Sequence, residues 1–436
     1  MFRIDPSLTH AREISYAERR DLSSRRTAKG VNLCRFRTVD GVLDVAALRR
    51  ALRQLALRHE ALRTHFEKDA TGAPIRRVEA EAEIPCVQLD LREFSVCHEQ
   101  VRIQALAVAE EAFPADASPL ARIGVLEVAN AQTVIVISIA ALIADGQAVA
   151  IIIRELSELY LAEVAKRAPD LPELEYGLSA FVASQVAWMQ SPAYRERVAQ
   201  LQERLHGQIE KTGGVAQLHF SPETKDSFLL DREFPAGFSE MLVSAARIAK
   251  VTVPTALMAL TGLSVARARD VRGLFFTSTF SNRSINGTAN LVGYLSTTMP
   301  SFLDANPAGG SVECVKALHR EFFLLMSQFG MIPISEISPG IAECYPPAPA
   351  GSSIKFGKIV MDVTQNDFSR LFGLPSRTFQ ASIAGGLGAE YKFVFRAPRS
   401  GAVELWVKGL RQSGSEELAL RVIDELLPSS LASMCN

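Results

Sequence analysis

The feature that most constrains this chain is a strand-to-helix junction near residue 140. The apolar run from Thr133 to Ile139 has the length of one buried strand. After Asp145-Gly146, apolar residues recur with the spacing of a helix face, at Val149, Ile152, Ile153, Leu156, Leu159 and Tyr160. Loops between the elements of a rigid scaffold often carry functional side chains. We therefore take residues 140–146 as the candidate site.

The same alternation of strands and helices runs along the whole chain. In the first half, the pattern predicts strands over 31–37, 75–91 (two short strands) and 120–128, and helices after Asp44 and over 101–112. It also predicts a long helix over 181–206 with an interruption at Ser191-Pro192. In the second half, it predicts strands over 228–234, 274–280, 391–395 and 403–407, and helices over 239–249 and 253–266. This pattern is typical of an α/β protein.

A break in the pattern predicts two lobes. The segment from Lys166 to Leu178 is rich in proline and acidic residues and has no apolar period. We place the boundary there, which gives an N-terminal lobe of residues 1–170 and a C-terminal lobe of residues 171–436.

Composition excludes several classes of function. Hydrophobic residues make up 48% of the chain and charged residues 22%, as in a soluble protein with a large core. The net charge of −1 gives no electrostatic reason to expect a nucleic acid or an anionic membrane as partner. The six cysteines show no metal-binding spacing and the N-terminus lacks the apolar core of a signal peptide, so we expect a reduced, cytoplasmic protein without a metal site.

The segment of residues 58–66 carries a family resemblance. It reads Arg-His-Glu-Ala-Leu-Arg-Thr-His-Phe. This matches every fixed position of the second motif, Arg-His-Glu-x-Leu-Arg-Thr-x-Phe, of the condensation-domain superfamily of nonribosomal peptide synthetases. The chain therefore resembles that superfamily.

Other motifs of the superfamily are present in part. The opening motif, Ser-x-Ala-Gln-x-Arg, is matched at Ser15, Ala17 and Arg19, with Glu18 in place of glutamine. The motif Gly-x-Phe-x-Asn-Thr-x-Pro is matched at Gly293, Thr298 and Pro300, with Thr297 in place of asparagine. Residues 328–334 retain only a glutamine and Pro333 of the motif His-Gln-Asp-x-Pro-Phe. The resemblance thus covers nearly the whole chain and is weaker toward the C-terminus.

The resemblance implies a fold and an activity. The fold would be two lobes of the chloramphenicol-acetyltransferase type, each a mixed sheet flanked by helices, forming a V-shaped pseudo-dimer around a central tunnel. The activity would transfer an acyl group from a phosphopantetheine thioester on an acyl or peptidyl carrier protein to an amine or a hydroxyl. No cofactor would be bound by the chain itself.

The junction departs from the superfamily's active-site motif, which is two histidines, three variable residues and Asp-Gly. Asp145 and Gly146 are retained, but Ala140 and Ala141 occupy the histidine positions. The resemblance implies that the second histidine would hydrogen-bond the nucleophile, and the methyl group of Ala141 cannot accept a proton. The family's aspartate pairs with an arginine from the second lobe, which here corresponds to Arg283.

Two further site residues are assigned a structural role. We expect Arg63, together with Glu60, to form buried polar links that support the site. Gly146 would allow the turn into the helix, either because a side chain would clash or because φ is positive.

No other side chain replaces the missing histidine in the sequence. The seven histidines all lie outside the junction, and Ser138 has no neighbouring base and is expected to face the core. The glycine-rich segment 385–388 follows no clear strand, so we interpret it as a crossover loop and not as a nucleotide-binding loop.

These observations leave several hypotheses open. The leading one is a stand-alone condensation-type acyltransferase whose chemistry is impaired or unconventional. The alternative is an inactive docking module that binds a carrier protein or recruits a tailoring enzyme, and a third is a transferase that uses acyl-CoA. The paired alanines are explained either by a deliberate knock-out or by natural divergence, and the weak C-terminal motifs favour divergence.

Overall fold

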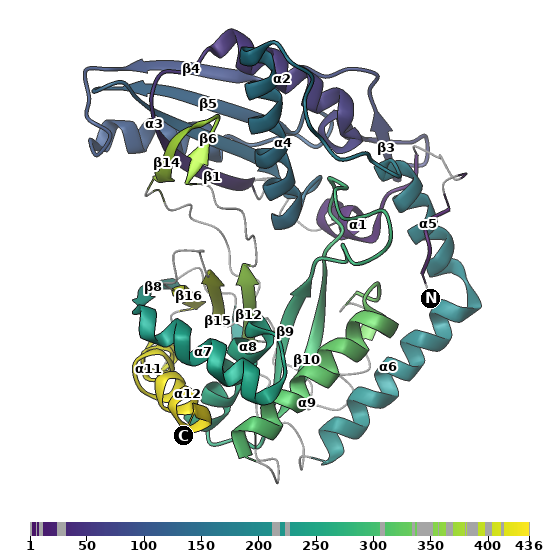
Figure 1. The fold of residues 1–436 in the computed structure, drawn as a ribbon. Coiled ribbons are helices and arrows are strands. Elements are labelled where there is room, and N and C mark those ends of the chain that lie inside the picture. The colour runs from purple at the N-terminus through teal and green to yellow at the C-terminus, as the bar shows by residue number, and fades with distance from the viewer. Residues whose placement is uncertain are drawn as a thin grey trace. The chain divides into compact units, whose positions relative to one another are not determined.

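The computed structural model describes residues 2–5, 7, 12–23, 32–211, 219–222, 227–305, 310–333, 336–337, 352–355, 357–362, 369–379, 381, 391–396, 403–410 and 414–435. The chain forms two compact units (Figure 1). Unit 1 consists of Met1–Ser191, Ser281–Ser296 and Asn366–Gly385. Unit 2 consists of Pro192–Phe280, Thr297–Gln365 and Gly386–Asn436.

Unit 1 is built on a sheet with the strand order β13-β14-β1-β6-β5-β4. Its strands are β1 (Asn32–Asp40), β4 (Cys86–Leu91), β5 (Ala121–Val128), β6 (Gln132–Ala140), β13 (Arg370–Leu371) and β14 (Leu374–Thr378). Only β4 and β5 pair in parallel; the other pairs are antiparallel. Figure 1 shows β14, from late in the chain, beside β1.

The helices of unit 1 are α1 (Tyr16–Ser23), α2 (Val45–Arg58), α3 (Glu99–Glu110), α4 (Gly146–Ala165) and α5 (Leu178–Gln190), with a short 3₁₀ helix, η2 (Glu60–Arg63). The strands β2 (Thr64–Lys68) and β3 (Pro74–Val78) form a separate hairpin. Alternate residues of β1 and β6, such as Phe36 and Val136, pack with Val101 and Ala105 of α3. Helix α2 packs against α4.

Unit 2 is built on a second sheet, with the strand order β10-β9-β12-β15-β16-β8. Its strands are β8 (Ser227–Phe234), β9 (Gly273–Phe280), β10 (Thr297–Asp304), β12 (Gly357–Asp362), β15 (Tyr391–Arg396) and β16 (Val403–Leu410). Strand β12 is parallel to both its neighbours, so this sheet is also mixed. The short strands β7 (His219–Pro222) and β11 (Ser352–Lys355) pair with each other.

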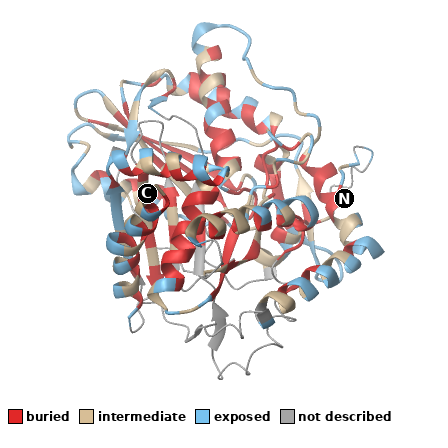
Figure 2. Cartoon of the chain, turned by 60° about the horizontal axis from the view of Figure 1, so that its bottom comes forward, coloured by how far each residue is buried: buried red, intermediate tan, exposed pale blue. Residues whose placement is uncertain are grey.

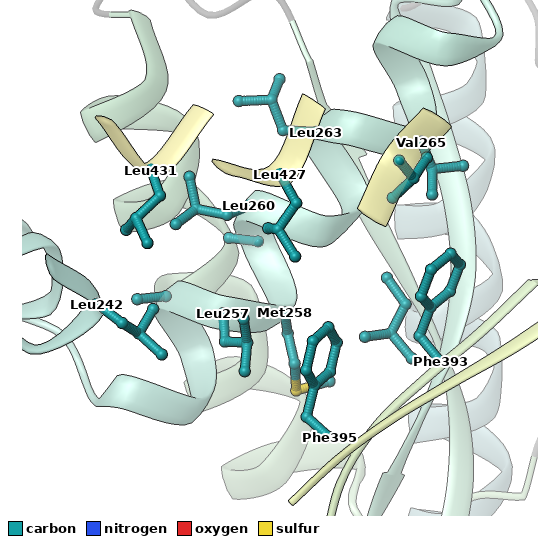
Figure 3. Packing of buried hydrophobic residues seen from close by; sticks show 14 of the residues in the cluster. Leu242, Leu257, Met258, Leu260, Leu263, Val265, Phe393, Phe395, Leu427 and Leu431 are labelled. Atoms are coloured by element: carbon teal, nitrogen blue, oxygen red, sulfur yellow. The ribbon is translucent and has the colours of Figure 1, made fainter. Parts of the chain in front are cut away.

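The described helices of unit 2 are α6 (Pro192–Lys211), α7 (Ala236–Ala249), α8 (Val253–Ala268), α9 (Gly310–Leu324), α11 (Ser415–Arg421) and α12 (Leu427–Cys435), with π-helical turns at η3 (Leu325–Phe329) and η4 (Val422–Leu426). Helix α8, predicted over 253–266, is present and is buried along most of its length. Its Leu257 and Leu260 belong to one apolar cluster with Phe393 and Phe395 of the sheet (Figure 3). Figure 2 shows buried residues along the strands and on one side of many helices.

The predicted fold class is confirmed, because each unit is a mixed sheet flanked by helices. The division of the chain differs from a single boundary after residue 170. Helix α5 belongs to unit 1, where Ser184 accepts a hydrogen bond from the backbone N–H of Asp5 (2.8 Å) and Gln185 one from that of Tyr16 (3.0 Å). Two later segments also return to unit 1.

Two further expectations concern single segments. The helix predicted over 181–206 is present as α5 and α6, and the break between them lies at Ser191-Pro192, where the sequence predicts the interruption. The glycine-rich segment 385–388 lies outside the described residues.

In the part of the chain that the structure describes, no single helix combines the length and apolarity needed to cross a bilayer. The pair Gly237–Ala249 and Val253–Ala268, bent by 97° at their junction, meets those limits only when both are counted together.

Candidate functional site

The predicted junction is present and is built around the N-terminus of α4. Strand β6 ends at Ala140, whose N–H donates to the carbonyl of Leu120 (2.9 Å). A turn follows, and the N–H of Ile143 donates back to the carbonyl of Ala140 (3.1 Å). Asp145 is the N-cap of α4. The apolar β-branched run thus forms the strand, and the aspartate starts the helix.

The carboxylate of Asp145 accepts four hydrogen bonds. Oδ1 accepts from the N–H of Ala148 (2.8 Å), and Oδ2 accepts from Nη1 of Arg283 (2.9 Å) and from the N–H groups of Leu295 (3.0 Å) and Ser296 (2.9 Å). The side chains of Asp145 and Arg283 are each 5% exposed. Three of the four bonds go to Oδ2 and one to Oδ1. A carboxylate has about four lone-pair sites, so most of the capacity of this one is used in holding the corner.

The guanidinium of Arg283 ties the same corner to the chain around it. Nη2 donates to the carbonyls of Leu291 and Gly293 (both 3.2 Å), and Nη1 also donates to the carbonyl of Ser281 (3.2 Å). We call Asp145, Arg283 and these backbone partners the 145–283 clasp. The predicted pairing of Asp145 with Arg283 is present.

The origin of Arg283 differs from the expectation. The resemblance assigned this arginine to the second lobe, but the contacts place Ser281–Ser296 in unit 1. The segment is folded on itself: Nδ2 of Asn282 donates to the carbonyl of Leu295 (2.8 Å), and Oγ1 of Thr288 donates to the carbonyls of Ile285 (2.6 Å) and Asn282 (3.2 Å). The clasp therefore lies within one unit.

The expected role of Gly146 is wrong. This residue is the first of α4, is exposed and does not have a positive φ. A Cβ atom added to it would meet no heavy atom within 4 Å in the described structure. Glycine is therefore not required here by the turn into the helix, because Asp145 alone supplies the extended N-cap conformation, with φ −113° and ψ 178°.

At positions 140 and 141 the junction presents only methyl groups. Ala140 is buried and Ala141 is partly exposed. Ser138 is fully buried, and its Oγ donates to the carbonyl of Ala109 (2.8 Å), so it is a core residue as predicted.

Tyr294 directly precedes Leu295, whose N–H belongs to the clasp, and carries a phenol. Its oxygen accepts a hydrogen bond from Nη2 of Arg20 (2.7 Å). Burial raises the pKa of Tyr294, although Arg20 opposes the shift. The phenol is therefore neutral near pH 7 and is not a base there.

Two side chains of the second motif contact Glu155 in the middle of α4. Nε of Arg58 (2.7 Å) and Nε2 of His59 (2.8 Å) both contact Oε2 of Glu155, whose side chain is 0% exposed. Burial raises the pKa of Glu155, but the hydrogen bond and charge of His59 and Arg58 outweigh it and hold the pKa below its ordinary value. This cluster fastens α2 to α4.

Glu60 and Arg63 of the same motif bind the ends of helices and of a strand. This is a structural role, as the sequence predicts. Oε2 of Glu60 accepts from the N–H (2.6 Å) and Oγ (2.7 Å) of Ser179 at the start of α5. The guanidinium of Arg63 donates to carbonyls at the end of α2 and after β3, namely those of Ala56, Leu57, Glu79 and Ala80. Both residues are half-buried and not fully buried.

The opening motif is a capping box at the start of α1. The N–H of Ser15 donates to Oε2 of Glu18 (2.6 Å), and the N–H of Glu18 donates to Oγ of Ser15 (3.1 Å). Oε1 of Glu18 lies 3.5 Å from Nε of the fully buried Arg76. Burial raises the pKa of Glu18, and Arg76 opposes the shift.

Two parts of the site were missed by sequence reasoning. The backbone donors of Leu295 and Ser296 carry no side-chain signal. Glu155 did carry one, because it lies three residues after Ile152 and four before Leu159, on the apolar face of its helix. Among the described residues, no group of three or more His, Cys, Asp and Glu side chains is placed to hold a metal ion.

Comparison with known proteins identifies the family. Residues 29–328 match the model of the condensation domain. The chain belongs to the condensation-domain family. It is 30% identical over 171 residues to tyrocidine synthase 2 of Brevibacillus parabrevis, an alignment that covers 39% of this chain but only 4% of that synthase. The chain is thus similar to a small part of a much longer protein.

Solved structures show the same fold at low sequence identity. The first condensation domain of the calcium-dependent antibiotic synthetase has a TM-score of 0.76 and 18% identity, with 97% of this chain and 96% of that chain covered. The X-domain from teicoplanin biosynthesis, in its complex with OxyB, has a TM-score of 0.74 and 16% identity, with 97% and 93% covered. The chloramphenicol-acetyltransferase-like fold predicted for the two units is confirmed.

Proposed function

We propose that this protein acts in nonribosomal peptide or related biosynthesis, where it binds an acyl chain carried on the phosphopantetheine of a carrier protein and joins it to an amine. Membership of the condensation-domain family supports the carrier-protein partner. The observation that carries the rest is the occupancy of the corner: Asp145 accepts four hydrogen bonds, and Ala141 supplies only a methyl group.

This corner favours an amine over a hydroxyl as the acceptor. A neutral amine attacks a thioester without prior loss of a proton, whereas a hydroxyl needs a base. In the amine reaction the C–N bond forms, the C–S bond breaks, the pantetheine sulfur leaves as a thiolate, and the surplus proton of the amine passes to that thiolate or to water. Loss of general-base help lowers a rate by about 10²–10⁴-fold, and positioning of the reactants accounts for what remains.

The second candidate is a docking module without catalysis. It is favoured by the structural likeness to the X-domain, which was solved in complex with OxyB. A module of that kind would bind a carrier protein or a tailoring enzyme and would leave the thioester intact.

One assay separates the two candidates. Acyl-loaded carrier protein is mixed with amine and alcohol acceptors, and the products are measured by intact-protein mass spectrometry. The wild-type chain is compared with Ala141→His, which restores a base, and with Ala141→Asn, which adds a polar side chain that is not a base. A parallel arm supplies the acyl group as acyl-CoA.

The proposal predicts amide product from the wild type, more from Ala141→His, and no gain from Ala141→Asn. Product from Ala141→His alone would indicate a disabled enzyme. Binding of the carrier protein with no product from any variant would favour the docking module. Faster turnover of acyl-CoA than of the carrier-bound acyl chain would rule out the carrier protein as donor.

A further inference from the structure

A cavity of about 250 Å³ lies within unit 1, apart from the junction residues 140–146. Three chain segments line it: residues 58–63 at the end of α2, residues 174–178 before and at the start of α5, and residues 291–292. All three segments belong to the same unit. The cavity is smaller than the roughly 300–1,000 Å³ usual for drug-sized ligands, so it suits a small molecule.

Of the two arginines in the lining, Arg58 has free hydrogen-bond donors. Nε of Arg58 donates to Glu155 (2.7 Å) and Nη2 donates to the carbonyl of Pro172, while Nη1 has no partner among the described residues. The Arg58 side chain is 21% exposed. Arg63, also in the lining, uses three of its nitrogens on backbone carbonyls. Arg58 is therefore the group with capacity to hold a carboxylate.

Of the two glutamates in the lining, Glu175 has a free acceptor. The carboxylate of Glu60 is engaged by Ser179. Glu175 is exposed and makes no hydrogen bond or ion pair within the described part of the chain. A free carboxylate at the rim of a cavity is a ready partner for an ammonium group.

Apolar side chains also contribute to the lining, next to His59 and Gly177. Leu178, Leu291 and Val292 are almost completely buried and contribute to the lining, together with the half-buried Leu174 and Tyr176. The formal charges of the lining arginines and glutamates balance, two against two, so the cavity does not select a simple anion or a simple cation. It offers one donor group, one acceptor group and apolar surface.

We infer that this cavity binds a small zwitterion with an apolar side chain, of the amino-acid class. Its carboxylate pairs with Nη1 of Arg58 and its ammonium with Glu175, while the side chain covers Leu178 and Val292. This inference rests on the lining of unit 1 alone and does not depend on the proposed function.

The cavity shares its walls with the supports of the 145–283 clasp. The carbonyl of Leu291 accepts from Nη2 of Arg283 (3.2 Å), and Arg58 binds Glu155 on α4, the helix that Asp145 caps. A ligand in the cavity therefore contacts the segment of Leu291 directly and is linked to α4 through Arg58. Exchange of the Leu295 and Ser296 amide hydrogens is a local reporter of such binding.

The test is titration of the full chain with L-leucine, followed by calorimetry and by amide hydrogen exchange. Two analogues are titrated in parallel: 4-methylpentanoate, which lacks the ammonium, and 3-methylbutylamine, which lacks the carboxylate. We expect both analogues to bind at least tenfold more weakly than leucine, because a hydrogen bond to a charged group contributes about 1.5–3 kcal/mol and 1.4 kcal/mol is tenfold in affinity. Serine, which lacks the apolar side chain, is expected to bind more weakly too.

The variant Glu175→Gln is exposed and should fold normally, and we expect it to weaken leucine binding at least tenfold. Its matched control is Glu173→Gln, which removes a neighbouring exposed carboxylate outside the lining and should leave binding unchanged. Val292→Trp fills the cavity and should abolish binding. Absence of leucine binding, equal binding of 4-methylpentanoate, or equal loss in both glutamate variants would each overturn the inference.

Discussion

The corner at Asp145 in unit 1 and the core around α8 in unit 2 are stabilised in different ways. At the corner, the buried carboxylate of Asp145 and guanidinium of Arg283 bind each other across 138 positions of sequence. Both groups also bind the backbone of the segment that contains Arg283. Around α8, Leu257, Leu260 and Leu263 pack against aromatic and aliphatic side chains in one apolar cluster (Figure 3).

The difference bears on how each region tolerates change. Hydrogen bonds are directional, and removal of one partner leaves a desolvated charge without compensation. Apolar packing has no fixed direction, so swaps that keep the volume are tolerated while cavities are not. A buried ion pair adds little net stability over an apolar replacement, so the clasp serves to fix one geometry of the corner.

The two tryptophans allow each region to be followed separately. The chain has two, Trp188 on α5 in unit 1 and Trp406 on β16 in unit 2. The variant Trp406→Phe leaves Trp188 as the single fluorescent reporter, in unit 1. The variant Trp188→Phe leaves Trp406, in unit 2. Unfolding of unit 1 is read in the first background and unfolding of unit 2 in the second.

The largest effect is expected from Asp145→Asn. The amide keeps the shape but loses the charge that faces Arg283, so unit 1 should lose about 3–5 kcal/mol of unfolding free energy. Urea unfolding followed at Trp188 measures it. The matched control is Asp44→Asn, because Asp44 caps α2 through Ala47 (2.9 Å) and asparagine caps equally well. Equal losses in both variants would contradict a special role for the clasp.

The second prediction concerns the pH dependence of Glu155. Its pKa is lower in the folded chain than the ordinary value of 4.5. The ionised form therefore contributes stability that is fully present above about pH 4.5 and is lost as the pH falls through the lower, folded pKa. Glu155→Gln should destabilise unit 1 at pH 7, but by less than Asp145→Asn, because the Arg58 side chain left without a carboxylate is 21% exposed.

The difference in unfolding free energy between wild type and Glu155→Gln should become smaller as the pH falls below 4.5. Unfolding curves at a series of pH values, read at Trp188, test this. A difference that stays constant across the series would show that the ion pair with Arg58 and His59 is not its cause.

The third prediction concerns the apolar core of unit 2. Leu260→Ala should cost about 2–5 kcal/mol, because Leu260 is fully buried in the cluster. Leu260→Met nearly keeps the volume and should cost less than about 1.5 kcal/mol. Both are read at Trp406. Similar costs for the two variants would mean that shape, and not only volume, is fixed in this core.

The smallest effect is expected from Gly146→Ala. Alanine has the higher helix propensity, and a Cβ atom at this position has free space. The variant should keep or raise the stability of unit 1, by less than about 1 kcal/mol. A clear loss in thermal unfolding would show that residue 146 is constrained by something other than the turn.

The sequence predicts the elements well and their connections less well. The apolar run before residue 140 and the helical spacing after it define β6 and α4, because period and burial are local properties. The return of Ser281–Ser296 to unit 1 is not predictable from any period, since it depends on backbone donors and on a buried arginine. A single boundary after residue 170 places this segment in the C-terminal lobe, because the boundary was drawn from local composition alone.

The candidate site shows the same limit. The resemblance identifies Asp145 and Arg283 as a pair, and the structure contains that pair. The partners of the second motif needed the fold, because Arg58 and Glu155 are 97 positions apart and meet only when α2 packs on α4. A charged residue on an apolar helix face was the available signal, and it indicates burial but not the partner.

The pairing of β14 with β1 has a consequence for synthesis of the chain on the ribosome. The outer edge of β1 is covered by Leu374–Thr378, so that edge stays open until most of the polypeptide has been made. At about 5–20 residues per second, the delay is on the order of tens of seconds. An open strand edge is a template for pairing with other chains. A nascent or truncated product that ends before β14 is therefore a species for chaperones to shield.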